Sequence, residues 1–416
     1  MAKKENRHAE LVSASANIDA PYELPEGWEW CRLPECVSIV TGKKDANYGT
    51  PDGKYLFFTC AEQPLRCDDY SFEGESLLLP GNGANVGQVI YYDGQFEVYQ
   101  RTYVLQKIIE SFSLKYLYYH ILGFWENYNH DKQYGSATNY IKMGNFLNYI
   151  FPLPPTLAEQ QRIVNRIETM FAKLDEAKEK AQNVVDSFET RKAAILHKAF
   201  NGQLRIDNEE LKIEDWEVRE LDVDFDIVSG IQKTPSRVPK NNPVPYLTVA
   251  NVFRDRIDLS EIRYFEVSDA EVEKLKLIEK DILVVEGNGS GNEIGRCAMW
   301  RNEITVCVHQ NHIIRLRKKN DSVLPEYVLL YLNSSEGKAI MKEKAKTTAG
   351  LYNLSAGKIK TISVPYPPLN YQLSIVNFLD IVLEKESRAK EAAQTVLDQI
   401  ALLKKSILAR AFRGEL

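Results

Sequence analysis

The chain has 416 residues, of which 44% are apolar and 26% are charged, so it has the composition of an ordinary soluble protein with room for two to four domains. Its formal net charge of −6 argues against a protein that coats nucleic acid with a uniformly basic face, so such binding needs local basic patches or a basic partner. No apolar run approaches the length of a membrane span, and residues 1–20 lack the apolar segment of a signal peptide. We therefore expect a cytoplasmic protein with a flexible N-terminus over residues 1–20.

The cysteines and histidines do not form a metal-binding or disulfide pattern. There is no Cys-x-x-Cys pair, so buried, reduced thiols are expected. His309 and His312 are close in sequence but have no third ligand nearby, which disfavours a metal site. The cysteines are Cys31, Cys36, Cys60, Cys67, Cys297 and Cys307.

Two globular segments open in the same way, at an offset of 188 residues. Each begins with a tryptophan, Trp28 or Trp216, followed by a strand-like apolar run that ends in a glycine turn. We expect the tryptophans to anchor the two cores, because a buried Trp removes a large apolar area from water. The turns carry cations that are better candidates for binding: Lys43, Lys44 and Lys233.

Both segments continue with an apolar strand, a loop rich in glycine and asparagine, and a further strand. The loops, Gly81–Gly87 and Gly287–Gly295, suggest left-handed backbone or the close approach of another molecule. Neither matches the phosphate-binding patterns of nucleotide-binding proteins, and a plain hairpin turn is the alternative. Asparagine can read the edge of adenine, so the side chains of interest are Asn82, Asn85, Asn288 and Asn292.

The stretches VYQRTYVLQ and VHQNHIIRLRKK alternate as strands do and place polar residues among apolar ones. Gln100 matches Gln310 at an offset of 210, and Arg101 and His312 lie nearby. A satisfied buried glutamine or a solvent-facing side is the ordinary explanation, and contact with a base or a phosphate is the sharper one.

A helix is expected next in each segment, over SLKYLYYHILGFWENY and LPEYVLLYLNSSEGKAIMKEK. A turn of small residues, an asparagine, a basic residue and an apolar strand then lead into prolines. Such a turn suits a phosphate backbone, although it suits an ordinary loop equally. The residues concerned are Thr138, Asn139, Asn353 and Lys358.

The last element of each segment is a long helix that occurs twice. Residues 160–204 align with 372–416 without a gap at an offset of 212, with 19 of 45 positions identical. Each copy follows a proline-rich stop, PLPP or PYPP, and ends in Ala-Phe-x-Gly-x-Leu. Repeats of this kind decide the architecture and are sought before motifs.

Apolar residues recur in both copies at alternating spacings of four and three, which predicts a coiled-coil seam. Arg191 interrupts the first seam and Glu386 the second. An antiparallel pair of these helices would give pseudo-twofold symmetry, and a helix packed on its own domain is the alternative. The seam residues are Ile163, Ile167, Met170, Leu174, Ala177, Ala181, Val184, Phe188 and Ile195, and Ile375, Leu379, Val382, Ala389, Ala393, Val396, Ile400, Leu403 and Ile407.

The sequence contains no recognisable catalytic motif. It lacks a P-loop for ATP, an H-E-x-x-H metal site and a G-x-S-x-G nucleophile. It also lacks an Asn-Pro-Pro-aromatic motif for methylating a base amino group, and a glycine-rich turn suited to S-adenosylmethionine. We expect a protein that is not itself an enzyme.

These features together resemble the specificity (S) subunits of type I restriction-modification systems, the HsdS family. The resemblance covers the chain after about residue 20 and rests on PLPPTLAEQQRIV, its second copy PYPPLNYQLSIV, the paired helix ends, the Trp-Glu starts and the Gly/Asn loops. The second copy departs from the pattern at Tyr371, where the first has Glu159.

The resemblance implies an α+β fold with two similar α/β target recognition domains, separated by two long antiparallel coiled-coil helices that form a pseudo-twofold repeat. The expected boundaries are a flexible segment 1–20, recognition domain 1 over 21–154, a central spacer helix over 155–204, recognition domain 2 over 205–366 and a C-terminal spacer helix over 367–416.

The resemblance also implies a function and partners. Each recognition domain reads one half of a split double-stranded DNA site, and the helices set the spacing and dock two methylase subunits. Restriction subunits join the full complex. No cofactor is expected in this chain, since S-adenosylmethionine, ATP and Mg²⁺ belong to the partners. The competing hypothesis is a non-catalytic scaffold that carries two protein- or glycan-binding modules on a coiled coil.

The expected DNA-binding residues follow from loop position and residue type. For the first domain they are Lys43, Lys44, Asn82, Asn85, Arg101, Thr138 and Asn139. For the second they are Lys233, Arg237, Lys240, Asn288, Asn292, Arg296, Gln310 and Lys358.

Overall fold

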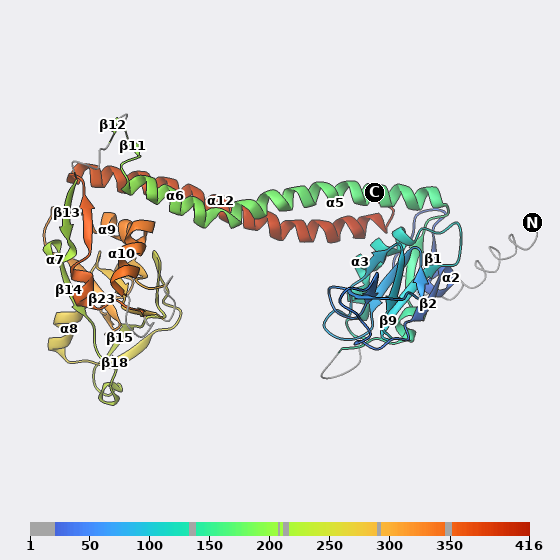
Figure 1. Ribbon diagram of the computed structural model, residues 1–416, viewed down its shortest axis with the longest axis horizontal. Coiled ribbons are helices and arrows are strands. Elements are labelled where there is room, and N and C mark those ends of the chain that lie inside the picture. Colours follow the sequence, from blue (N-terminus) through green and yellow to red (C-terminus); the bar gives the residue numbers. More distant parts are fainter. Residues whose placement is uncertain (1–20, 133–138, 207–208, 211–215, 289–292, 346–351) are drawn as a thin grey trace, which may run out of the picture. The chain divides into compact units, whose positions relative to one another are not determined.

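The computed structural model describes residues 21–416 except 133–138, 207–208, 211–215, 289–292 and 346–351. The chain divides into two compact units (Figure 1). Unit 1 comprises the chain up to residue 182 together with residues 394–416, and unit 2 comprises residues 183–393. Each unit therefore contains one globular segment and a part of each long repeated segment. None of the described helices is long and apolar enough to cross a membrane.

Unit 1 is built on two small sheets and one separate strand pair. The first sheet is antiparallel, in the order β2 (Val37–Thr41), β9 (Thr102–Lys107), β6 (Ser76–Pro80), β7 (Ile90–Tyr92). The second runs β4 (Leu65–Cys67), β3 (Tyr55–Phe58), β8 (Gln95–Val98), β5 (Phe72–Glu73), with β3 and β8 parallel. The separate pair joins β1 (Glu29–Arg32) to β10 (Ile150–Leu153). The helices of the globular part are α2 (Leu33–Cys36), α3 (Leu114–Asn129) and α4 (Met143–Leu147).

Unit 2 repeats this plan. Its first sheet runs β14 (Phe225–Ser229), β23 (Ile313–Lys318), β19 (Ile282–Val285), β21 (Cys297–Met299). Its second runs β18 (Arg263–Glu266), β15 (Pro243–Leu247), β22 (Val308–His309), and its separate pair joins β13 (Glu217–Glu220) to β25 (Ser363–Tyr366). The helices are α7 (Leu221–Asp224), η3 (Pro235–Arg237), α8 (Asp269–Leu275), α9 (Pro325–Asn333), α10 (Ser335–Ala345) and α11 (Ala356–Lys360). Three further strand pairs are β16 (Val252–Phe253) with β17 (Arg256–Ile257), β20 (Gly287–Asn288) with β24 (Tyr352–Asn353), and β11 (Arg205–Ile206) with β12 (Glu209–Glu210).

The matching strand order confirms that the globular segments are duplicated. The tryptophans that open them precede β1 and β13, as expected, and both pack on the core of their own unit. The second expected helix is two helices, α9 and α10, because Ser334 between them has an extended backbone. The start of each long helix after the prolines is also as expected, at Leu157 and at Leu369.

The first repeated segment differs from the single helix expected over 155–204. It forms α5 (Leu157–Asp186) and α6 (Phe188–Phe200), while the second copy forms one helix, α12 (Leu369–Ala411). At the junction the guanidinium of Arg191 donates to the carbonyl oxygen of Val184 at 3.3 Å and to the Ser187 hydroxyl. The second copy carries Gln399 and Leu403 at the positions of Ser187 and Arg191, so it cannot form these hydrogen bonds from an arginine side chain.

The helix parts run antiparallel within each unit. In unit 1, Asp175 of α5 pairs with Lys404 of α12, and Arg162 near the start of α5 donates to the carbonyl oxygen of Leu416. In unit 2, the two residues that interrupt the seams meet, since Arg191 Nε donates to Glu386 Oε2 at 2.7 Å. The expected seam positions are buried or half-buried except for three on α12: Ala389, and Val396 and Leu403, which are 39% and 48% exposed. The stripe along α12 is therefore only partly covered.

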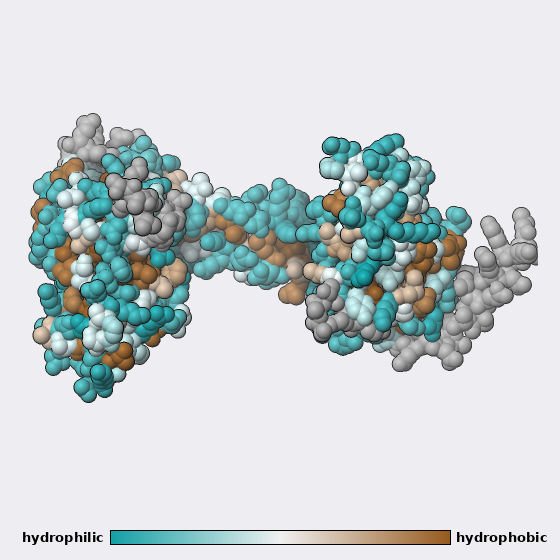
Figure 2. Space-filling view, turned by 60° about the horizontal axis from the view of Figure 1, so that its bottom comes forward, coloured by the Kyte–Doolittle hydropathy of each residue, from teal (hydrophilic) through white to brown (hydrophobic). Residues whose placement is uncertain are grey.

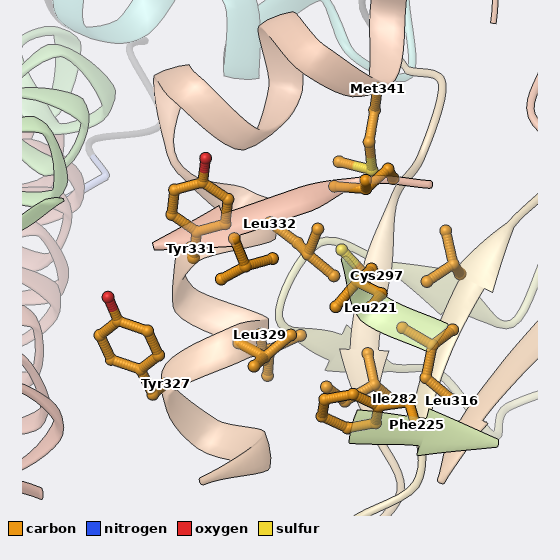
Figure 3. Packing of buried hydrophobic residues seen from close by; sticks show 14 of the residues in the cluster. Leu221, Phe225, Ile282, Cys297, Leu316, Tyr327, Leu329, Tyr331, Leu332 and Met341 are labelled. Atoms are coloured by element: carbon orange, nitrogen blue, oxygen red, sulfur yellow. The ribbon is translucent and has the colours of Figure 1, made fainter. Parts of the chain in front are cut away.

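The helix ends complete the cores of the globular parts. In unit 1, Phe412 is fully buried, and its ring lies 5.0 Å from that of Tyr116 and 4.8 Å from that of His120. In unit 2, Phe200 lies 5.4 Å from the ring of Tyr327, and Figure 3 shows this tyrosine on α9 among the packed core side chains. The ends of the helices therefore pack on the globular parts, which was the alternative expectation. The middle parts of the helices pair with each other, as the seam predicted.

The contribution of Phe412 to the core of unit 1 can be tested by removing its aromatic ring. The substitution Phe412→Ala leaves a cavity against α3 and is expected to cost about 3–5 kcal/mol of unfolding free energy. Calorimetry should show that only the transition of unit 1 moves to lower temperature. Leu402→Ala is the control, because Leu402 is 68% exposed and its truncation should change stability by less than about 0.5 kcal/mol.

Candidate nucleic-acid interface

The Gly/Asn loop of unit 1 joins β6 to β7, which are antiparallel neighbours, so it is the hairpin connection that was one of the two expectations. Gly81 donates its N–H to the carbonyl oxygen of Arg101 at 2.8 Å, and a Cβ at this position would lie 2.4 Å from the same oxygen. Gly83 and Gly87 have φ angles of +89° and +111°. The glycines therefore allow both the close approach and the left-handed backbone.

A second loop lies directly against this hairpin. Gly83 donates to the carbonyl oxygen of Asn139 at 2.9 Å, and Ile141 donates to that of Gly81 at 2.9 Å. Asn82 forms a β-bridge with Tyr140, and Asn139 is exposed. Two stretches that are far apart in the sequence are thus joined at one edge of the sheet. Thr138 lies outside the described residues.

Gln100 and Arg101 lie in a turn between β8 and β9, and not inside one strand as expected. The chain leaves one sheet at Val98 and enters the other at Thr102, so the alternation spans two strands. Gln100 donates its N–H to the carbonyl oxygen of Lys44 at 2.9 Å and its side-chain amide to Asp45 at 2.9 Å. Arg101 is exposed beside the Gly/Asn loop.

The lysine turn after β2 is part of the same surface. Lys43 is exposed, and the ammonium of Lys44 lies 3.9 Å from the centre of the Tyr48 ring. A hydrogen bond with the Tyr48 hydroxyl raises the pKa of Lys44, so this side chain remains a cation at neutral pH. Exposed cations on loops suit phosphate contacts.

A further turn, residues 59–63, reaches this surface and was not singled out from the sequence. It connects β3 to β4, and the side-chain amide of Asn85 donates to the carbonyl oxygen of Cys60 at 2.8 Å. Asn85 also accepts a hydrogen bond from Gln88 at 3.1 Å. The amide of Asn85 is therefore engaged in holding this turn.

Unit 2 brings the corresponding loops together. The backbone carbonyl oxygen of Glu286 accepts a hydrogen bond from the N–H of Leu354 at 2.6 Å. This bond lies next to the strand pair of β20 (Gly287–Asn288) with β24 (Tyr352–Asn353). Lys358 donates to the carbonyl oxygen of Asn353 at 3.0 Å and stays partly exposed. Asn292 lies outside the described residues, and only the backbone of Asn288 is described.

The turn between β22 and β23 corrects the expected match of Gln100 with Gln310. Tyr99 donates its backbone N–H to the carbonyl oxygen of Phe58, and Gln310 donates in the same way to that of Leu247. The next residue of each turn repeats the match, since Gln100 donates to the carbonyl oxygen of Lys44 and Asn311 to that of Ile231. The structural counterpart of Gln100 is therefore Asn311. The sequence match was one residue out: both turns have three residues, 99–101 and 310–312, and their true offset is 211 instead of 210.

The other expected basic residues of unit 2 have different surroundings. Lys233 and Lys240 are exposed. Arg296 donates to the carbonyl oxygen of Val249 at 3.0 Å. Arg237 forms a two-pronged ion pair with Glu271, at 2.8 and 2.6 Å, which joins η3 to the start of α8. The charges of Lys233 and Lys240 are thus more available to a ligand than that of Arg237.

The two histidines in the β22–β23 region do not share a site. His309 is fully buried and contacts the carbonyl oxygen of Ile313 through Nδ1 at 2.8 Å. Burial lowers the pKa of His309 to about 4, so the ring is neutral at pH 7. His312 is exposed and pairs with Glu286. Within the described part of the chain, no group of three His, Cys, Asp or Glu side chains could hold a metal ion.

Each unit therefore brings several loops together beside its sheets, and their described side chains include amides and cations. Such a surface can accept and donate hydrogen bonds and neutralise phosphates.

Comparisons with known proteins agree on one family. Residues 25–186 and 213–395 match the model described as "Type I restriction modification DNA specificity domain". The chain is 29% identical over 290 residues to the EcoKI type I restriction enzyme specificity subunit of Escherichia coli K12, covering 68% of this chain and 61% of that protein. It is 23% identical over 415 residues to the EcoDI specificity subunit of Escherichia coli, covering 95% and 90%.

Solved structures share the fold. The HsdS subunit from Thermoanaerobacter tengcongensis matches with a TM-score of 0.63 and 19% identity, over 95% of this chain and 99% of that one. A chain from a structural study of the assembly and conformational transition of the type I R-M system matches with a TM-score of 0.71 and 19% identity, over 95% and 100%. Together with the two copies of the domain, they support an α+β protein with two similar domains and long linking helices.

The ion pair between Arg237 and Glu271 makes a pH-dependent prediction for unit 2. Hydrogen bonds from Arg237, and then from the N–H of Ser268, lower the pKa of Glu271 from 4.5 to about 2. A lowered pKa in the folded state stabilises the protein above the unfolded value and loses this effect as the pH falls. Unit 2 should therefore lose stability between about pH 4.5 and pH 2, and the loss should be smaller in Glu271→Gln. Equal losses in both proteins, measured by urea unfolding, would contradict the assignment.

Proposed function

Because this chain belongs to the type I restriction modification DNA specificity family, we propose that it is the DNA sequence-recognition subunit of a type I restriction-modification complex. Each unit reads one half of a bipartite site in double-stranded DNA. The observation that carries this proposal is the duplicated loop surface: corresponding loops converge in both units, but with different side chains. Two related surfaces with different side chains suit two different half-sites.

Exposed cations position the DNA and the loop side chains specify its bases. In unit 1, Lys43, Lys44 and Arg101 suit the phosphates, and Asn82 and Asn139 lie where the two joined loops meet. In unit 2, the exposed or partly exposed cations of the loops are Lys233, Lys240 and Lys358, and Gln310 lies in the turn between β22 and β23. The chain as a whole has a net charge of −6, so basic partner subunits contribute to neutralising the phosphates.

The long helices set the distance between the half-sites and dock two methylase subunits. Large apolar side chains are exposed on α12, including Ile381 at 55%, Leu402 at 68% and Leu403 at 48%. Figure 2 shows apolar residues on the surface of the helical part, among hydrophilic ones. Exposed large apolar side chains on a helix suit contact with another protein.

The reactions belong to the partners in this proposal. Methylase subunits bind S-adenosylmethionine and modify the base, and restriction subunits, where present, use ATP and Mg²⁺. This chain supplies sequence recognition and geometry and is not itself catalytic. The loops contribute hydrogen-bond donors, acceptors and cations, which are the groups that base and phosphate contacts need.

Single-molecule sequencing of methylated bases tests the proposal directly. Cells that express this chain with its methylase should carry methylation at one bipartite motif, and cells with the methylase alone should not. The purified complex should bind DNA that contains this motif with an affinity that falls steeply with salt concentration. Binding to protein or glycan, with no salt-dependent affinity for DNA, would instead favour a scaffold.

The spacing role predicts the effect of lengthening both helices. One extra heptad after Ala177 and one after Ala389, which are equivalent positions of the repeat, keeps the apolar pattern in phase. Seven residues add about 10 Å of helix, or about three base pairs of DNA. The sequenced motif should keep both half-sites with a longer gap. An unchanged gap in a folded, active complex would contradict the spacing role.

A further inference from the structure

We propose that the turn of residues 59–63 is a base-reading element of unit 1, and that Glu62 and Gln63 determine specificity within its half-site. This inference rests on the proposed function, since it identifies which side chains read the DNA. The turn contains none of the glycine, asparagine or lysine signals that mark the other loops. Its place in the structure is what assigns it a role.

The turn is held against the recognition loops on two sides. The Asn85 amide donates to the carbonyl oxygen of Cys60 at 2.8 Å, which ties the turn to the Gly/Asn loop. On the other side, the Cys60 thiol lies 3.5 Å from the carbonyl oxygen of Arg101 and 3.9 Å from the Thr102 hydroxyl. Gly81 donates to that same Arg101 carbonyl oxygen. Residues 59–63 therefore extend the surface made by the Gly/Asn loop and the Arg101 turn.

Unit 2 holds the corresponding turn in the same way with different chemistry. Thr59-Cys60-Ala61 after β3 corresponds to Thr248-Val249-Ala250 after β15. There the guanidinium of Arg296, at the end of the second Gly/Asn loop, donates to the carbonyl oxygen of Val249 at 3.0 Å. Asparagine in one unit and arginine in the other hold the equivalent carbonyl oxygen. The fixed position of the turn beside the Gly/Asn loop is thus a shared feature of both units.

The side chains at the tip of the turn are available to a ligand. Ala61, Glu62 and Gln63 are exposed. Within the part of the chain that the structure describes, no hydrogen bond or ion pair engages the side chain of Glu62 or Gln63. By contrast, the amide of Asn85 is engaged by Cys60 and that of Gln100 by Asp45. The side chains of Glu62 and Gln63 can therefore bind a ligand, whereas those of Asn85 and Gln100 form hydrogen bonds within the protein.

The chemistry of these two side chains fits base edges. Glutamine can pair with N6 and N7 of adenine, and a carboxylate accepts a hydrogen bond from N4 of cytosine. A carboxylate close to the DNA backbone is repelled by the phosphates. It is favourable in such a place when it meets an exocyclic amino group in the major groove. We assign Glu62 to a cytosine and Gln63 to an adenine of the half-site that unit 1 reads.

The experiment compares the methylated motifs of cells that express the methylase with wild-type chain, Glu62→Gln, Gln63→Ala or the control Glu110→Gln. Glu110 is likewise exposed, but it follows the other end of β9. Glu62→Gln should weaken the preference at one cytosine position by about 5- to 100-fold, and Gln63→Ala should do so at an adenine position. The second half-site and the gap should stay unchanged and so report a folded, assembled protein.

Three outcomes would overturn the inference while the proposed function stands: an unchanged motif in both variants, a uniform loss of methylation at every site, or stronger binding with no change of motif. The last result would mean that Glu62 only repels phosphates. If the wild-type chain directed no motif at all, the proposed function itself would fail. Asn85→Ala adds a check on the positioning residue, because release of the turn should relax the same base positions that Glu62→Gln and Gln63→Ala relax.

Discussion

The structure depends on aromatic side chains at the far ends of the repeated helices. Phe412 completes the core of unit 1, most of which is built from residues 31–167, and Phe200 completes that of unit 2. Burying a phenylalanine contributes about 1.5–3 kcal/mol, a large share of a typical net stability. The globular segments are consequently incomplete as consecutive pieces of sequence, and each compact unit includes helix ends from outside its own segment.

The sequence predicted the features that depend on repetition and periodicity. The duplication and the proline stops are as expected, and the helices that follow begin at Leu157 and Leu369 in place of 155 and 367. All but three of the expected seam positions are buried or half-buried. It did not predict the one-residue interruption at Ser187, because the apolar spacing continues through this position and only the hydrogen bonds of the Arg191 side chain mark it. It also did not show that Arg191 and Glu386 meet, since pairing between distant segments leaves no local signal.

The candidate site was predicted at the level of loops and not of side-chain poses. Glycine and asparagine mark unusual backbone, so the loop at Gly81 and its counterpart at Gly287 were found. The engagement of Asn85 with Cys60, and of Arg237 with Glu271, depends on tertiary contacts that spacing does not reveal. The turn at Glu62 was missed because its residue types are those of any exposed hairpin.

The ion pair between Arg191 and Glu386 has a consequence for which helices can pair. At the offset of 212, the counterpart of Arg191 is Leu403 and that of Glu386 is Leu174. If two copies of the first repeat paired in the same register, Arg191 would face a leucine and lose its carboxylate. A partly buried charge without a partner is costly. The two repeats are therefore no longer interchangeable, and the chain carries its own discrimination against self-association through matching halves.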